Sequence, residues 1–200
     1  MSAYAQFTAL HAAFKQTPEW AAMVRTVENS PWHREANVAV HTQMLLDYYM
    51  ANFYEHRSET QRMLSLVSCL FHDVGKPPAE ILKFSEERGN YRAYHGHEQV
   101  SARMWVDYAL TNRALVTELT GFSLADISNV ALMLEHHVPF ALKDKQKRKA
   151  LKDAFINRMG PAGHQAWLDL LNSDQHGRTS DDQPKKLADV AEWMIAWEAV

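Results

Sequence analysis

MLSLVSCLFHDVGKP, residues 63–77, is the stretch of sequence that decides the predicted fold. Its first nine residues, 63–71, are apolar almost all round a helix, which is typical of a helix buried at the centre of a domain. Gly75 and the following prolines end that helix. His72 and Asp73 therefore stand at the end of the most buried helix, where ionisable side chains need a partner or a bound ion. The stretch predicts a helical core with a polar site at one end.

The hydrophobic residues of the remaining chain also recur at helical spacing, with Gly and Pro between the segments. We predict helices at about 3–15, 18–28, 35–55, 59–73, 97–112, 123–137, 145–158, 162–174 and 185–199. Alternating runs of β-branched residues, internal repeats and linkers long enough to divide domains are not evident in the sequence. The prediction is an all-α fold, a helical bundle in which residues 1–200 form a single domain.

Composition narrows the class of protein. A hydrophobic fraction of 46% in 200 residues is enough to bury a core, which excludes a mainly disordered chain. The formal charge of −3 provides no overall attraction to nucleic acid or anionic lipid, and one cysteine cannot build a disulfide framework. A membrane span and a secretory signal are not expected, so a cytoplasmic location is predicted. The one residue type present in unusual excess is histidine, of which the chain has eleven.

Several of these histidines share apolar helix faces with acids. His41 lies on the face of Val38 and Leu45, His137 ends the face of residues 127–134, and Asp174 ends the face of residues 167–171. Buried imidazoles and carboxylates cost several kcal/mol, roughly, unless they are paired or coordinated. We therefore predict that they meet around a divalent metal, of a kind that accepts mixed nitrogen and oxygen ligands.

The ordered series of these residues resembles the HD-domain superfamily of metal-dependent phosphohydrolases. It comprises His41, His72-Asp73 in LFHDVGKP, His97 in YHGHEQ, His136-His137 in LEHHVP, and Asp174 in NSDQHGR. WHREANVAVHT at residues 32–42, HGHE at 95–98 and the D-x-x-G-R of 174–178 are similar to the HD domain of bacterial CCA-adding tRNA nucleotidyltransferases. The resemblance covers about residues 30 to 180 and implies a single HD domain. Because only two short helices are expected before residue 30, CCA addition itself is not expected.

The resemblance implies one or two divalent ions, which could be Mn, Fe, Co, Ni, Mg or Zn. His41, His72, Asp73 and Asp174 match the ligands of a first metal. Asp73 would bridge to a second metal that is completed by His97 and a histidine of the pair at 136 and 137. Helical periodicity favours His137 as the inward member of that pair, but the family comparison leaves both open.

The expected chemistry is hydrolysis by metal-activated water, with Asp73 as the central catalytic carboxylate. Lys76 and Arg178 are candidates for binding phosphate oxygens. His95 and His33 are candidates for protonating the leaving oxygen, although each also fits an ordinary surface position. Glu35, six residues before His41, could fix an imidazole tautomer or could simply be a carboxylate favoured in a first helical turn.

The expected substrate is a phosphorylated small molecule or nucleotide, such as a nucleoside phosphate or a 2′,3′-cyclic phosphate, and an RNA end is also compatible. Two alternatives stay open: an HD-type di-iron oxygenase, and a non-catalytic metal- or nucleotide-binding regulatory module. The basic run at residues 143–152 could attract RNA but also suits a solvated helix face. The C-terminal Trp193 and Trp197 could pack on the domain or on a second subunit, and the oligomeric state is open.

Overall fold

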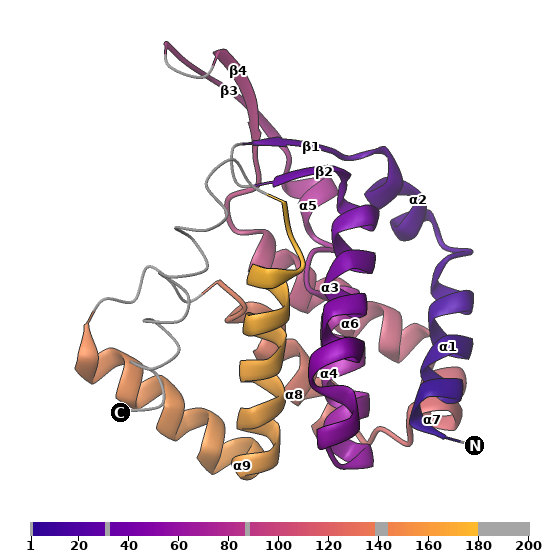
Figure 1. The fold of residues 1–200 in the computed structure, drawn as a ribbon. Helices are drawn as coiled ribbons and strands as arrows, with labels where there is room; N and C mark the ends of the chain where they lie inside the picture. The colour runs from indigo at the N-terminus through magenta and orange to yellow at the C-terminus, as the bar shows by residue number, and fades with distance from the viewer. Residues whose placement is uncertain (1, 31–32, 87–88, 139–143, 180–200) are drawn as a thin grey trace.

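The computed structural model describes residues 2–30, 33–86, 89–138 and 144–179, and is mostly helical. The helices stand side by side as a bundle, and two small hairpins lie at one end of it (Figure 1). The helical elements are α1 (Ala3–Phe14), α2 (Pro18–Arg25), α3 (Val38–Asn52), the 3-10 turn η1 (Tyr54–His56), α4 (Glu59–Phe71), α5 (Lys76–Ala79), α6 (His97–Thr111), α7 (Arg113–Thr120), α8 (Leu124–Glu135) and α9 (Lys145–His176). The strands are β1 (Val27–Ser30), β2 (His33–Asn37), β3 (Ile81–Ser85) and β4 (Gly89–Ala93).

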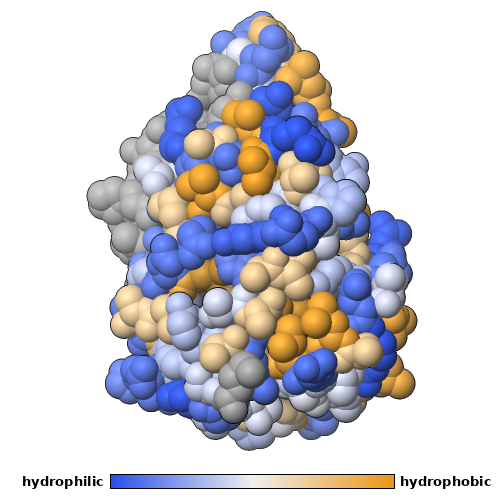
Figure 2. Space-filling view, turned by 90° about the vertical axis from the view of Figure 1, so that its right-hand side faces the viewer, coloured by the Kyte–Doolittle hydropathy of each residue, from blue (hydrophilic) through white to orange (hydrophobic). Residues whose placement is uncertain are grey.

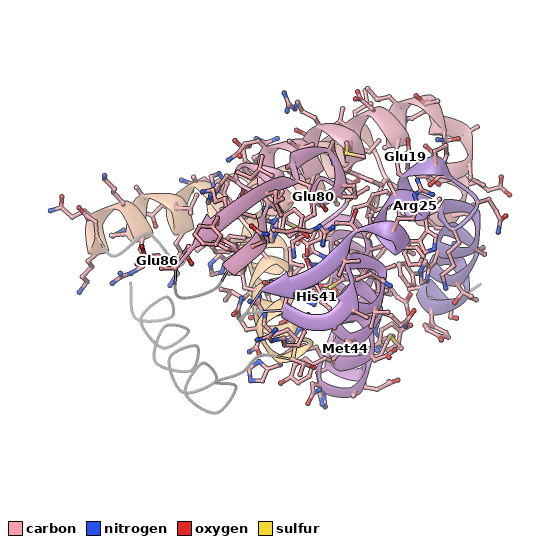
Figure 3. The ribbon with its side chains drawn as sticks, turned by 90° about the horizontal axis from the view of Figure 1, so that it is seen from above. Glu19, Arg25, His41, Met44, Glu80 and Glu86 are labelled. Carbon is pink, nitrogen blue, oxygen red and sulfur yellow. The ribbon has the colours of Figure 1, made fainter. Side chains whose placement is uncertain are left out.

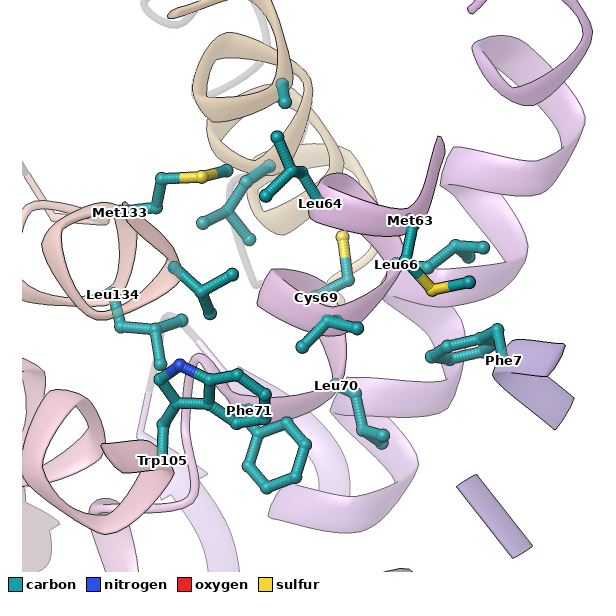
Figure 4. Packing of buried hydrophobic residues seen from close by; sticks show 14 of the residues in the cluster. Phe7, Met63, Leu64, Leu66, Cys69, Leu70, Phe71, Trp105, Met133 and Leu134 are labelled. Atoms are coloured by element: carbon teal, nitrogen blue, oxygen red, sulfur yellow. The ribbon is translucent and has the colours of Figure 1, made fainter. Parts of the chain in front are cut away.

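Helix α4 is the centre of the core, as the stretch 63–77 predicts. All residues of α4 from Met63 to Phe71 are buried, and the helix packs against α1, α3, α8 and α9. Figure 4 shows its side chains between those of the neighbouring helices, with the Phe71 and Trp105 ring centroids 4.8 Å apart. Ser58 and Gln61 form a reciprocal cap at the start of α4, which satisfies backbone N–H groups there. A well-packed helix with a fixed start holds its end, at His72 and Asp73, in a defined place.

The prediction of a strictly all-α fold is wrong in part, because two antiparallel hairpins interrupt the helices. Residues 27–28 and 35–37 were assigned to helices, but Val27 pairs with Asn37 and Glu28 with Ala36 in the first hairpin. Asn37 then caps α3 by accepting a hydrogen bond from the backbone N–H of Val40. Helix α3 therefore starts at Val38, because the strand pairing holds the preceding residues extended.

The second hairpin, β3–β4, projects from the top of the bundle (Figure 1). It runs from a pairing of Ile81 with Ala93 to a pairing of Ser85 with Gly89. Seen from above, the labelled Glu80 marks its base and Glu86 its outer end (Figure 3). Hydrophobic surface runs along one side of this projection in Figure 2. Sequence reasoning missed it because a five-residue strand carries too few residues to show a clear alternating period.

Helices α7 and α9 also differ from the predicted elements. Helix α7, residues 113–120, was not predicted, and it follows α6 after the single residue Asn112. The predicted helices 145–158 and 162–174 form one element, α9, whose backbone leaves the helical conformation at Gly160 before Pro161. The break between them is therefore confirmed as a kink. The predicted helix 185–199, with Trp193 and Trp197, lies outside the described residues. Among the described helices, none has the length and apolar character needed to cross a membrane.

Stability should fall on mild acidification because of His11 on α1. Its ring lies against Phe7 and Trp20, and burial, aided by Lys15, lowers its pKa from 6.5 to about 4. The folded protein therefore binds fewer protons than the unfolded chain below pH 6.5, so stability present above that pH is lost as the pH falls. We expect a loss of about 1 kcal/mol by pH 4, after allowance for solvent screening.

The measurement is urea unfolding of the wild type and His11→Leu between pH 7 and pH 4. Leucine fills the same buried position but cannot bind a proton. The free energy of unfolding of the variant should therefore fall by about 1 kcal/mol less than that of the wild type between pH 7 and pH 4. Equal pH slopes for the two proteins would show that His11 does not contribute.

Candidate metal centre

Five helix ends or starts carry the chemistry-bearing side chains to one place beneath the hairpin β1–β2. His41 comes from the first turn of α3, and Figure 3 shows it at the end of that helix nearest the strands. The other members are His72 and Asp73 after α4, His97 at the start of α6, His137 just beyond α8, and Asp174 near the end of α9. We call these six residues the cage.

One half of the cage is formed by His41, His72 and Asp174, all of them buried. Nε2 of His41 lies 3.0 Å from Oδ1 of Asp174 and 3.2 Å from Nε2 of His72. Atoms that bind one transition metal at about 2.1 Å stand about 3–3.4 Å from one another. Two of the three distances in this group match a shared ion, and the third, between Nε2 of His72 and Oδ1 of Asp174, is longer at 3.9 Å.

The other half is formed by Asp73, His97 and His137. Oδ1 of Asp73 lies 3.1 Å from Nε2 of His97 and 3.5 Å from Nε2 of His137. Its other oxygen, Oδ2, faces the first half, 3.1 Å from Nε2 of His72. If metal ions were bound, Asp73 could therefore serve as a ligand in both halves.

The hydrogen bonds of the imidazoles test whether a cation fits. Nδ1 of His97 lies 2.7 Å from the carbonyl of Tyr94, and Nδ1 of His137 lies 2.6 Å from the carbonyl of Leu134. A carbonyl only accepts, so Nδ1 carries the proton in each ring and Nε2 presents a lone pair. These two Nε2 atoms lie 3.2 Å apart. Two lone pairs repel at that distance unless a proton or a metal ion lies between them, so the residues fit a metal.

Asp73 supports the same conclusion. The side chain is buried, and neither of its oxygens accepts a hydrogen bond of good geometry, although Nζ of Lys76 lies 2.7 Å from Oδ2. Burial would raise the pKa of Asp73, but the charges of His72 and Lys76 hold it well below its usual range. A buried carboxylate that stays ionised with unsatisfied oxygens is a suitable metal ligand.

The protonation states of the other ligands mostly agree with this. Burial lowers the pKa of both His41 and His137, which keeps these imidazoles neutral. Burial also opposes the ionisation of Asp174, but Arg178 holds the pKa of that carboxyl well below its usual range. His72 is the exception: despite burial, Asp73 raises its pKa. A metal ion would supply the positive charge that the two carboxylates otherwise draw from a proton on His72.

Two glycines allow the helices to approach closely enough to form the cage. A Cβ at Gly177 would lie 2.4 Å from Cα of Leu45, one turn after His41 on α3. A Cβ at Gly75 would lie 2.5 Å from the carbonyl oxygen of His97. Both contacts are with backbone atoms, so any side chain there would push a ligand-bearing helix away.

Of the doublet at 136 and 137, the structure brings only His137 into the cage. His136 is half-buried, and its ring packs edge-on against Phe155, with centroids 5.9 Å apart. The doublet follows the last turn of α8, so consecutive side chains point in different directions. The inward position of His137 agrees with the helical period of the sequence.

A pair of substitutions should separate the two histidines. His137→Ala is expected to reduce cobalt binding by at least tenfold because it removes a nitrogen ligand. His136→Ala should leave cobalt affinity within twofold of wild type and cost only packing stability. Titration with Co²⁺, followed by its visible absorption, measures both. Equal losses of affinity in the two variants would contradict the assignment.

The predicted catalytic side chains lie in different surroundings. Nζ of Lys76 is buried between Asp73 and Glu28, 2.7 Å from each carboxylate. Arg178 is engaged with Asp174, with 2.6 Å between Nη2 and Oδ2. His95 is exposed, and its Nε2 lies 2.6 Å from Nζ of Lys83 on the β3–β4 hairpin.

Lys76 and Arg178 therefore contact the cage through its carboxylates. In the described structure His95 contacts the hairpin. The basic run is seen from residue 144 onward, where Lys145, Lys147 and Lys149 are exposed on the outer half of α9. Lys149 pairs with Asp153, which is the behaviour of a solvated helix face.

Glu28 belongs to the site but was not singled out from the sequence. Its side chain is fully buried, and it pairs with Lys76. In the predicted helix 18–28 this residue would have been at a helix end, with no reason to face the cage. Only the strand pairing of Glu28 with Ala36 places it beside Glu35 and above the cage. Burial would raise the pKa of Glu28, but Lys76 and His33 hold it well below its usual range.

Glu35 lies on β2, so the alternative that it is a carboxylate of a first helical turn is wrong. Its Oε1 is 3.7 Å from Nδ1 of His41, and it accepts a hydrogen bond of 2.7 Å from the backbone N–H of Thr179. It therefore faces the imidazole nitrogen that the cage does not use.

No family model and no curated protein matches this chain. The buried His/Asp groups of the described residues could hold metal ions.

Proposed function

We propose that the protein is a metal-dependent phosphohydrolase or phosphodiesterase of the HD-domain superfamily. The observation that carries the proposal is the placement of Asp73 between two groups of candidate ligands, with His41, His72 and Asp174 on one side and His97 and His137 on the other. Sites with two metal ions about 3.5–4 Å apart are common among enzymes that cleave phosphate esters. The order of the ligands along the chain, His, His-Asp, His, His, Asp, is that of the superfamily which the sequence resembles.

The residues of the chain supply the rest of the chemistry. When bound, divalent ions lower the pKa of a water molecule and neutralise the charge that develops on phosphate. Asp73 holds both halves of the cage together, and Lys76 holds Asp73. Glu35 faces Nδ1 of His41 and can keep the proton on that nitrogen, which leaves Nε2 free to act as a ligand. Arg178 orients Asp174 and lies close enough to the cage to contact a phosphate oxygen.

The substrate class that we propose is a nucleotide, another phosphorylated small molecule, or an RNA end with a terminal or 2′,3′-cyclic phosphate. The sequence resemblance to a tRNA-processing HD domain supports this class. His95 beside Lys83 adds basic groups along the β3–β4 hairpin, and such groups suit an anionic substrate.

A screen tests the proposal. The metal-stripped protein is supplied with Mn²⁺, Co²⁺, Ni²⁺, Mg²⁺ or Zn²⁺ and incubated with nucleoside phosphates, cyclic phosphates and phosphorylated metabolites. Release of phosphate or ring opening is followed, with His136→Ala as the matched control that keeps the cage. We expect turnover with at least one metal in the wild type and in the control.

Two other results would contradict the proposal. Oxygen consumption by the iron-loaded protein, with a mixed-valent spin signal and no phosphate release, would identify a di-iron oxygenase. Tight binding of metal and nucleotide without any turnover would identify a regulatory module.

A further inference from the structure

A second group of unsatisfied polar atoms lies beside the cage, under the β1–β2 hairpin. It consists of Glu28 on β1 with His33 and Glu35 on β2. The carboxylates of Glu28 and Glu35 are fully buried, and 16% of the His33 side chain is exposed. Oε2 of Glu28, Oε2 of Glu35 and Nδ1 of His33 are all shielded from solvent, and none makes a hydrogen bond of good geometry.

In each carboxylate one oxygen contacts Lys76 or Thr179, and the other oxygen faces His33. Nζ of Lys76 lies 2.7 Å from Oε1 of Glu28, and the backbone N–H of Thr179 donates a hydrogen bond of 2.7 Å to Oε1 of Glu35. The remaining oxygens lie 2.8 Å and 3.4 Å from the same atom, Nδ1 of His33. The ammonium of Lys76 lies between Glu28 and Asp73, so its single positive charge does not neutralise Glu28, Asp73 and Glu35 together.

We infer that Glu28, His33 and Glu35 form a further site for a divalent first-row transition metal. One imidazole nitrogen and two carboxylate oxygens are a ligand set that such ions accept, whereas Ca²⁺ prefers oxygen alone. The distances from Nδ1 of His33 match those between atoms bound to one ion. The exposed edge of His33 leaves a side of the site open to water, which can complete the coordination.

His41 separates this site from the cage. Its Nε2 faces Asp174 and His72, so a metal in the cage leaves the proton on Nδ1, toward Glu35. A ring in that state cannot bind a second ion through Nδ1. The further site therefore uses Glu28 in place of His41, and its occupancy does not depend on the proposed hydrolysis.

The test counts metal ions in four forms of the full chain: wild type, Glu28→Gln, Asp73→Ala, and the double variant. Each metal-stripped protein is dialysed against the same free Co²⁺ concentration, and bound cobalt is measured by mass spectrometry. We expect Glu28→Gln to bind one ion fewer than the wild type, Asp73→Ala to keep one ion, and the double variant to bind none. Glu80→Gln, which alters a carboxylate paired with Arg92 outside both sites, should match the wild type.

Proton NMR of the cobalt-loaded Asp73→Ala protein gives a second readout. One exchangeable, paramagnetically shifted imidazole proton is expected from His33, and it should vanish in the further variant His33→Gln. If Glu28→Gln binds as much cobalt as the wild type, the inference is wrong, and His33 is an imidazolium paired with the two carboxylates. If the cobalt counts are as expected but the wild type releases no phosphate from any substrate, the proposed function alone is contradicted. Circular dichroism confirms folding of each variant.

Discussion

Asp73→Ala is expected to abolish phosphate release, lowering turnover by at least a thousandfold, and to empty the cage of metal. The reason is that Asp73 is the only cage residue that faces both halves, with Oδ1 toward His97 and Oδ2 toward His72. Removing it leaves four imidazoles with Asp174 as the only carboxylate of the cage, and takes away the side chain that faces both halves. The measurements are a phosphate-release assay and cobalt binding at the cage.

The helical content of Asp73→Ala should stay close to that of the wild type, as measured by circular dichroism. The substitution lies after the end of α4, and the hydrophobic core does not include it. The control is Asp153→Ala, which removes an exposed carboxylate paired with Lys149 on α9. Near-normal turnover of Asp73→Ala with metal present would show that the active site has been assigned wrongly.

The second large effect is expected from Gly177→Ala. The added methyl group would lie 2.4 Å from the backbone of Leu45, so α9 and α3 must move apart. We expect a loss of about 1–3 kcal/mol in the free energy of unfolding. Because His41 and Asp174 sit on these two helices, separated by 3.0 Å, the same movement should weaken metal binding by tenfold or more.

Gly121→Ala provides the matched control. Gly121 ends α7 with a positive φ of 71°, and a Cβ there would meet nothing within 4 Å. It should lose about 1 kcal/mol from backbone strain alone and keep full metal affinity. Denaturant unfolding and cobalt titration measure both variants. If Gly177→Ala binds metal as tightly as the control, close helix approach does not set the cage.

Most of the cage was predictable from the sequence because five of its members lie on or at the end of apolar helix faces, whereas His97 was expected only from the family resemblance. His41, His72 and Asp174 each occupy a position where helical periodicity requires burial, and burial of ionisable groups implies that they meet. Choosing His137 over His136 followed from the same period. These inferences use only local spacing, which the chain carries openly.

The hairpins and Glu28 were not predictable by that reasoning. Short strands show no period, and Glu28 is buried only because β1 pairs with β2, a relation between segments rather than within one. The contacts of Lys76 could not be predicted for the same reason, because one of its two carboxylate partners is Glu28. The sequence pattern reports which residues face inward, but strand pairing decides which of them meet beside the cage.

The sequence separation within the cage bears on when the protein can acquire its metal. His41 and Asp174 are 133 positions apart, and β2 holds the residues just after α9 through a backbone bond from Arg34 to Thr179. The chain must therefore have been synthesised to beyond α9 before the half of the cage formed by His41, His72 and Asp174 can assemble. Before that point an ion could contact only an incomplete set, such as Asp73 with His97 and His137. If the protein binds metal in the cage, its complete ligand set therefore exists only once the last helix has packed, and the folded bundle would determine which ion is retained.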